Sequence, residues 1–170
     1  MKRSKMVKKF LTKIHHQILE GTLYAIENDN GFQIEAFRFN DNSGDHQCSE
    51  SRLESYKRVI LDYLDGRKVD FSFFPLNFSC LTPFQQKVLT VAQEIPRGVT
   101  ISYEELAVKA GFPGAARAVG SVMRKNRFPI IIPCHRVISK SGKIGGYSGM
   151  QIGAMIELKR KLLSLEGCVI

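Results

Sequence analysis

The pattern of apolar and polar residues predicts mixed α/β structure in the first half of the chain. Residues 5–19 carry apolar side chains at a helix-like spacing, with a strand over residues 14–19 as the alternative. Residues 22–26 and 32–39 are strand-like. The Asn-Asp-Asn-Gly sequence at 28–31 is a strong hairpin turn signal. These signals together predict a β-hairpin with a helix before it.

A second helix is predicted after the hairpin. Residues 40–49 form a polar stretch, which we expect to be a loop. Leucine, isoleucine and tyrosine then recur at helical spacing over residues 53–64, and the Asp-Gly pair at 65–66 ends that helix. Residues 71–78 contain a proline and are expected to be a covering segment that leads to a domain boundary near residue 79.

The second half of the chain is predicted to be mainly helical. A Thr-Pro pair at 82–83 supplies an N-cap and a proline at the first helical position, and Pro-Arg-Gly at 96–98 ends that helix. The sequence at 102–105, Ser-Tyr-Glu-Glu, is a capping box that predicts a helix over 103–110. Glycine and proline then lead into a helix over 115–125. Two short helices joined by such a turn suggest a helix-turn-helix.

The fold class is therefore predicted to be α/β (α+β). We expect an N-terminal mixed α/β domain over residues 1–79, mainly structural. A mainly helical domain with the helix-turn-helix follows over residues 80–170.

Charge is concentrated in the second half. The chain of 170 residues has a net charge of +9, and residues 79–170 hold 13 basic against 5 acidic side chains. Such an excess suggests a polyanionic partner, with a solubility surface as the alternative. No apolar run approaches the roughly 20 residues of a membrane span. The basic start of the chain leads into charged sequence instead of an apolar stretch, so we expect a cytoplasmic protein without a secretory signal.

The cysteines and histidines do not have the spacing of a metal site. Cys48, Cys80, Cys134 and Cys168 are far apart and include no Cys-x-x-Cys pair. In a cytosolic chain they are expected to be free thiols. We expect neither a metal nor a cofactor.

Reactive chemistry is expected around Cys134. Three isoleucines at 130–132 predict a buried extended stretch, which Pro133 ends. A thiol beside His135 and Arg136 has the ingredients for a lowered pKa, and the thiolate is the nucleophile. Adjacent residues on a strand point to opposite faces, so contact between thiol and imidazole needs a turn or a bridging water.

The sequence Ile-Pro-Cys-His-Arg-Val at 132–137 resembles the active-site motif of the O6-alkylguanine-DNA alkyltransferases, also called methylated-DNA–protein-cysteine methyltransferases. The resemblance covers nearly all of residues 80–167, in order and at the family's spacing. Besides the cysteine motif, the matching blocks are residues 82–88, 102–107, 115–120, 145–149 and 162–167.

The resemblance implies a single-turnover DNA repair reaction without a cofactor. Cys134 takes the alkyl group from O6-alkylguanine and keeps it as a thioether. His135 receives the thiol proton through a water and is oriented by Glu166. Tyr103 donates a hydrogen bond to the leaving purine. Asn126 bonds backbone atoms and ties the helix-turn-helix to the cysteine segment; activity on O4-alkylthymine is left open.

The resemblance also implies a pocket for the extruded base and a partner, double-stranded DNA that contains O6-alkylguanine. Tyr147 and Ser148 are expected to face the modified oxygen. Met123 and Val137 are expected to form apolar walls, with core packing as the alternative for Met123. No membrane is involved, the protein is expected to be a monomer, and cooperative binding on DNA is left open.

Arg117 is implied to replace the extruded base in the helix that enters the minor groove. Small side chains let that helix approach the DNA closely, and packing on a neighbouring helix is the alternative. The candidate DNA contacts are Arg117, Ala115, Ala116, Gly120, Gln85, Arg124 and Lys140.

Three features depart from the family pattern or leave its use open. Arg127 stands where proline commonly follows the hinge asparagine, and the stretch from Gly149 to Glu166 is longer than expected. Phe112 is either a DNA contact or a packing residue.

The alternative functions are a lesion-binding or regulatory protein without transfer and a cysteine hydrolase. Cys134 argues against the first, and the proline before it argues against the second.

Overall fold

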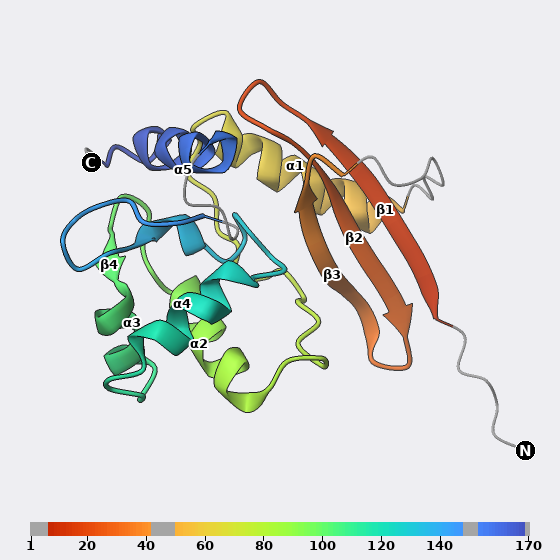
Figure 1. The fold of residues 1–170 in the computed structure, drawn as a ribbon. Coiled ribbons are helices and arrows are strands. Elements are labelled where there is room, and N and C mark those ends of the chain that lie inside the picture. The colour runs from red at the N-terminus through yellow and green to blue at the C-terminus, as the bar shows by residue number, and fades with distance from the viewer. Residues whose placement is uncertain (1–6, 42–49, 148–152, 169–170) are drawn as a thin grey trace, which may run out of the picture. The chain divides into compact units, whose positions relative to one another are not determined.

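The structure is a computed structural model that describes residues 7–41, 50–147 and 153–168. The chain forms two compact units, residues 1–77 and 78–170. Figure 1 shows a three-stranded sheet in the first unit and a mainly helical second unit, so the mixed α/β fold class is confirmed. In the part of the chain that the structure describes, no helix is both long and apolar enough to cross a membrane. The separate roles assigned to the two domains stay predictions.

The sheet of the first unit is antiparallel, in the order β1-β2-β3. Its strands are β1 (Lys8–His15), β2 (Glu20–Asn28) and β3 (Gly31–Phe39). The predicted hairpin is confirmed, because Asn28 pairs with Gly31 across the turn. Gly31 has a φ of 91°, a conformation that glycine adopts without steric cost.

The helix predicted over residues 5–19 is wrong, because this segment contains strand β1. The strand pairs with β2 along its whole length. Thr12 and Ile14 are fully buried and alternate with the more exposed Lys13 and His15. This is the two-residue period of a half-buried strand, and the apolar residues of this short segment also fit a helical spacing. The strand alternative was correct in type but was placed at residues 14–19.

Helix α1 (Ser51–Leu64) packs against β1 and β2 and confirms the helix predicted there. Its Glu54 accepts a hydrogen bond of 2.5 Å from the Thr12 hydroxyl. Phe71 and Phe74, from the predicted covering segment, are buried against each other with ring centroids 5.4 Å apart. Most of the predicted loop at 40–49 lies outside the described residues.

The second unit begins with α2 (Pro83–Gln93), which is followed by β4 (Ile101–Ser102) and the pair α3 (Tyr103–Lys109) and α4 (Ala116–Arg124). Both predicted N-caps are present, and the Ser102 cap is a complete capping box. Helices α3 and α4 pack against each other and against α2, as Figure 1 shows. The predicted pair of short helices is therefore confirmed.

The isoleucines at 130–132 are buried as predicted, but they are not extended. Ile130 has a φ of 73°, and the Ile132 amide donates to the Phe128 carbonyl at 2.8 Å, so the chain turns here. The Asn126 side chain bonds the backbone of the same two residues, Phe128 and Ile132. Local hydrogen bonds thus satisfy polar groups that a strand partner would otherwise satisfy.

The chain then forms the 3₁₀ helix η1 (Cys134–Arg136) and β5 (Val137–Ile138), which pairs in parallel with β4. The last element is α5 (Ala154–Leu165), which packs against η1. Its buried face consists of Leu158, Lys159, Leu162 and Leu163. Glu166 caps the C-terminal end of this helix, which brings its carboxylate to η1.

Candidate active site

Cys134 is the first residue of η1 and lies inside the second unit. It is only 5% exposed. Its amide donates to the Ile132 carbonyl at 2.8 Å, which fixes the backbone at the start of η1. Pro133 precedes it and has no amide hydrogen to donate. The backbone at Cys134 and His135 is therefore a 3₁₀ turn and not a strand.

The surroundings of the Cys134 thiol act on its pKa in opposite directions. Burial raises the pKa, because the thiolate loses the solvation of water. Hydrogen bonds from Asn126 and Tyr147 and the charge of Lys159 lower it. Burial is the largest of these effects, so the pKa lies above its ordinary value and the resting group is a thiol. The lowered pKa suggested by the sequence is therefore wrong for the resting protein.

Asn126 connects helix α4 to the cysteine segment. Its amide nitrogen donates to the Ile132 carbonyl at 3.0 Å, and its side-chain oxygen accepts from the Phe128 amide at 2.9 Å. These are the backbone bonds that the sequence analysis assigns to it. Arg127 lies within this hinge, and both bonds are present with it in place.

His135 and Glu166 form a buried pair beside the cysteine. The distance from His135 Nε2 to Glu166 Oε1 is 2.9 Å, and both side chains are 0% exposed. Arg136 donates to both carboxylate oxygens, at 2.9 and 2.8 Å, and also to the Ile95 carbonyl. The Gly98 amide adds a donor at 3.3 Å. The carboxylate is thus held by four donor–acceptor contacts from two segments of the chain, η1 and the residue Gly98.

These contacts set the state of the imidazole. Burial lowers the pKa of His135, and the nearby Glu166 opposes this effect without overcoming it. The ring is therefore neutral near pH 7 and able to accept a proton. The contact with Glu166 fixes the orientation of the ring, as in a nucleophile–base–carboxylate arrangement.

Tyr103 is the first residue of α3, and its side chain lies near Gly120 on α4 and Gly145 after β5. A Cβ atom placed on Gly145 would lie 3.6 Å from the Tyr103 hydroxyl oxygen, and one placed on Gly120 would lie 3.9 Å from its ring. Burial raises the pKa of Tyr103, and the Cys134 thiolate acts in the same direction. The phenol thus keeps its proton near neutral pH and can act as a donor.

The predicted apolar walls of the pocket lie in the interior. Met123 on α4 is 5% exposed, Val137 on β5 is 0% exposed, and Tyr147 is 3% exposed. Ser148 lies outside the described residues.

The candidate DNA contacts lie mainly on α4 and at its start. Arg117 and Arg124 are exposed, and Ala115, Ala116 and Gly120 are partly exposed. These positions form a small-residue helix surface flanked by cations. Two further candidates lie outside α4: Lys140 is exposed, and the Gln85 side chain accepts from the Thr82 amide in a capping box. Phe112 packs edge-on against Phe84, with ring centroids 4.8 Å apart.

Two charged residues of this region were not predicted from the sequence as parts of the site. Arg136 was named only as a neighbour of the thiol, although it binds Glu166 and Ile95. Lys159 was not named, although it is fully buried. A usable signal existed for the lysine, because it falls on the apolar face of the helix that contains Leu162 and Leu163.

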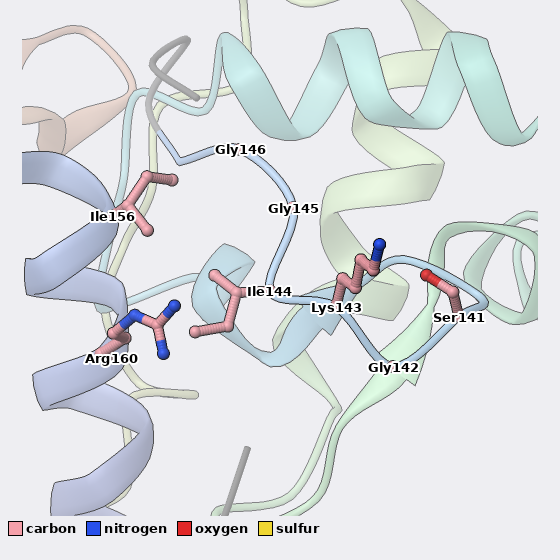
Figure 2. Close-up of a pocket in the computed structure, with 8 residues that line it drawn as sticks. All are labelled: Ser141, Gly142, Lys143, Ile144, Gly145, Gly146, Ile156 and Arg160. Carbon is pink, nitrogen blue, oxygen red and sulfur yellow. The ribbon is translucent and has the colours of Figure 1, made fainter. Parts of the chain in front are cut away.

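A hollow of about 690 Å³ lies between α5 and residues 141–146. Figure 2 shows Ile156 and Arg160 projecting from α5 toward it, with Ile144 opposite them. Residues 141–146, here called the strap, form the other wall of the hollow, and Lys143 is one of them.

The chain matches known proteins in sequence. The family described as "6-O-methylguanine DNA methyltransferase, DNA binding domain" matches residues 83–168. The chain is 44% identical over 105 residues to a methylated-DNA–protein-cysteine methyltransferase of Methanothermobacter thermautotrophicus, which covers 62% of this chain and 56% of that relative. The match thus spans little more than half of that relative's length. This chain is also 32% identical to the methylated-DNA–protein-cysteine methyltransferase of Kluyveromyces lactis. That match covers 95% of this chain and 77% of that relative.

Solved structures extend the similarity to nearly the whole chain. An O6-methylguanine methyltransferase variant of Mycobacterium tuberculosis aligns with a TM-score of 0.74 at 33% identity, covering 94% of this chain and 93% of that one. The Mycobacterium tuberculosis OGT protein, solved in complex with DNA, aligns with a TM-score of 0.73 at 34% identity, covering 92% of each chain. With this similarity and the buried cysteine, histidine and glutamate in one site, the chain belongs to the O6-methylguanine-DNA methyltransferase family.

Proposed function

We propose that this protein repairs DNA by moving the alkyl group of O6-alkylguanine in duplex DNA to its own Cys134, once per molecule. The observation that carries the proposal is the buried arrangement of Cys134 beside the His135–Glu166 pair. It lies in the same unit as a helix pair that presents Arg117 to solvent. The relatives bear the name of this activity, and one neighbouring structure contains DNA.

The first step is loss of the thiol proton. His135 is neutral, and Glu166 holds its Nε2, so Nδ1 is the nitrogen that takes the proton from Cys134 through a water. The proton leaves the thiol as the base enters the site. The charge of Lys159 and the hydrogen bonds from Asn126 and Tyr147 then stabilise the thiolate.

The second step is displacement at the alkyl carbon. A bond forms from the sulfur to that carbon as the bond from the carbon to O6 breaks. The electron pair of the broken bond passes to the guanine ring, which gains negative charge. Tyr103 keeps its proton and donates a hydrogen bond to the ring, so it stabilises the charge as it develops. The thioether has no easy route of hydrolysis, so each molecule reacts once.

The target carbon lies inside the base stack of duplex DNA, so the base has to be extruded. Extrusion costs a few kcal/mol. Arg117 fills the space that the base leaves, while Ala115, Ala116 and Gly120 let α4 approach the minor groove. The basic excess of the second unit supplies affinity for phosphates that does not depend on sequence. The protein acts as a monomer in the cytoplasm.

The test is the mass of the protein after incubation with a duplex that carries one O6-methylguanine. The expected result is one methyl group, on the peptide that contains Cys134, saturating at one per protein. Cys134→Ala should accept no methyl group and still bind the duplex, whereas Cys80→Ala, at an exposed cysteine, should react like the wild type. Binding without any mass change in the wild type would favour a lesion-binding protein instead.

A further inference from the structure

The turn between α3 and α4 leads into the helix that carries Arg117. Pro113 and Gly114 occupy its two central positions. The Ala115 amide closes the turn by donating to the Phe112 carbonyl at 3.1 Å. Gly114 has a φ of 81°, as the second central residue of a type II turn requires. The closing bond uses the Ala115 amide, so the Gly114 amide needs an acceptor from outside the turn.

Glu104 on α3 supplies this acceptor. Its Oε1 atom accepts from the Gly114 amide at 3.1 Å, across ten positions of the chain. Glu104 is the second residue of α3, so the bond links the first turn of that helix to the residue before the N-cap of α4. A hydrogen bond to a carboxylate is about twice as strong as one between neutral groups. The contact therefore fixes the turn at its α4 end.

Helix α4 has no cap of its own. Ala115 occupies its N-cap and has no side chain that accepts a hydrogen bond, and residues 116–119 of its first turn include no acid. The first amides of a helix lack partners within the helix, and this end favours negative charge. The Glu104 carboxylate lies at this end, so α3 supplies the negative charge that the sequence of α4 lacks.

The α3 end of the turn is fixed by a helix cap and by packing. The Phe112 amide donates to the Ala107 carbonyl at 2.8 Å, the long bond of a Schellman motif at the end of α3. The Phe112 ring packs edge-on against Phe84 of α2, with ring centroids 4.8 Å apart. The turn is thus anchored at one end by Phe112 and at the other by the bond between Glu104 and Gly114.

We propose that Glu104 is a positioning residue for base extrusion: its hydrogen bond to the Gly114 amide fixes the start of α4 and therefore the place at which Arg117 enters the DNA. This inference rests on the proposed function, in which Arg117 fills the space of the extruded base. The charge of the same carboxylate repels DNA phosphates, so it opposes binding. The hydrogen bond and the charge of Glu104 thus have opposite effects on repair, and two substitutions can separate them.

The experiment compares Glu104→Ala, which removes the acceptor and the charge, with Glu104→Gln, which removes the charge and keeps an oxygen acceptor. Glu105→Gln is the matched control, because it removes the same charge at the next residue and glutamine still completes the capping box with Ser102. Each protein reacts with methylated duplex, with the methylated strand alone and with free O6-benzylguanine. Single-turnover rates at saturating DNA exclude changes in affinity, and circular dichroism reports folding.

Glu104→Ala should slow transfer from the duplex by about tenfold, less than the roughly 100-fold that a small misplacement can cost, because Phe112 still anchors the other end of the turn. The single strand should lose less, and free O6-benzylguanine should react at the wild-type rate, because extrusion from a base pair is needed only in the duplex. Glu104→Gln and Glu105→Gln should react with the duplex at close to the wild-type rate.

Three results would overturn the inference. The first is equal slowing of Glu104→Ala on all three substrates, which would place the effect at the reacting groups instead of at α4. The second is a folded Glu104→Ala protein with the wild-type rate on duplex. The third is a Glu104→Gln or Glu105→Gln protein as slow as Glu104→Ala, which would assign the effect to charge. A wild-type protein that transfers no alkyl group from any substrate would overturn the proposed function instead.

If Glu104→Ala folds poorly, Glu104→Asp provides the same test with the charge in place. Aspartate is favourable in the first turn of a helix, but its side chain is one methylene shorter and does not reach the Gly114 amide as glutamate does. Glu104→Asp should show the same loss on the duplex alone, and hydrogen exchange followed by NMR should show faster exchange of the Gly114 amide than in the wild type. Faster exchange with wild-type transfer from the duplex would overturn the inference.

Discussion

Replacing Glu166 by glutamine keeps the size of the side chain but removes the charge that balances Arg136. The Glu166 side chain is 0% exposed and that of Arg136 is 9% exposed, so water cannot replace the lost partner. In the wild type, Arg136 donates to the carboxylate and the His135 ring contacts it. The amide of the glutamine would direct N–H donors toward these same two groups. Removal of one partner from a buried pair costs about 3–5 kcal/mol.

We expect Glu166→Gln to lower the free energy of unfolding by about 3 kcal/mol, the low end of that range, because the amide oxygen still accepts one hydrogen bond. The rate of methyl transfer should fall by about 100-fold, because His135 loses the group that orients it. Urea titration followed by circular dichroism measures the stability, and single-turnover transfer from methylated duplex measures the rate.

The matched control is Glu157→Gln, which changes an exposed carboxylate on the same helix. It should alter the unfolding free energy by no more than about 0.5 kcal/mol. A Glu166→Gln protein that loses less than about 1 kcal/mol would refute the reasoning, because a buried, uncompensated Arg136 could not then be present. If Glu166→Gln has normal stability but slow transfer, only the role of Glu166 in orienting His135 would remain supported.

Three further predictions concern different parts of the second unit. Arg117→Ala should slow transfer from duplex at least about tenfold more than transfer from free O6-benzylguanine, because only the duplex requires base extrusion; equal losses would contradict the role of Arg117. Tyr103→Phe should lower the single-turnover rate by about 100-fold without unfolding the protein, since one donor to the developing charge is lost; an unchanged rate would exclude that donor. Lys159 has a folded pKa of about 8 against 10.5 for the free side chain, so the unfolded state binds more protons between these values and stability rises with pH. In a Cys134→Ala background, which removes the titrating thiol, the lysine protein should gain about 3 kcal/mol relative to Lys159→Met from pH 8 to 10.5; a flat difference in urea titrations would contradict this.

Local signals predicted those parts of the fold in which one segment determines its own structure. The capping box at Ser102 and the turn at Gly31 are formed by neighbouring residues, and both are present in the structure. Helix α1 was predicted because its apolar residues recur at helical spacing over residues 53–64. Strand β1 was predicted as a helix, because its pairing partner β2 decides its conformation and no local pattern reports that partner.

The candidate site shows the same division. The cysteine motif indicated a nucleophile and its histidine, and the family resemblance added Glu166, a residue 31 positions from His135. The roles of these residues in transfer stay predictions. Neither source indicated that Lys159 is buried with three carbonyls, because that depends on how α5 packs against β5 and the strap.

The sequence by itself determined the helix caps, the hairpin, the excess of positive charge and the reactive cysteine motif, since each follows from residues close in the chain or from composition. Only the tertiary structure decided the buried carboxylate cluster and the raised pKa of Cys134. These depend on desolvation and on hydrogen bonds between segments far apart in sequence. Burial changes the free energy of a charged or polar group by several kcal/mol, and burial is a property of the packed unit rather than of a local sequence.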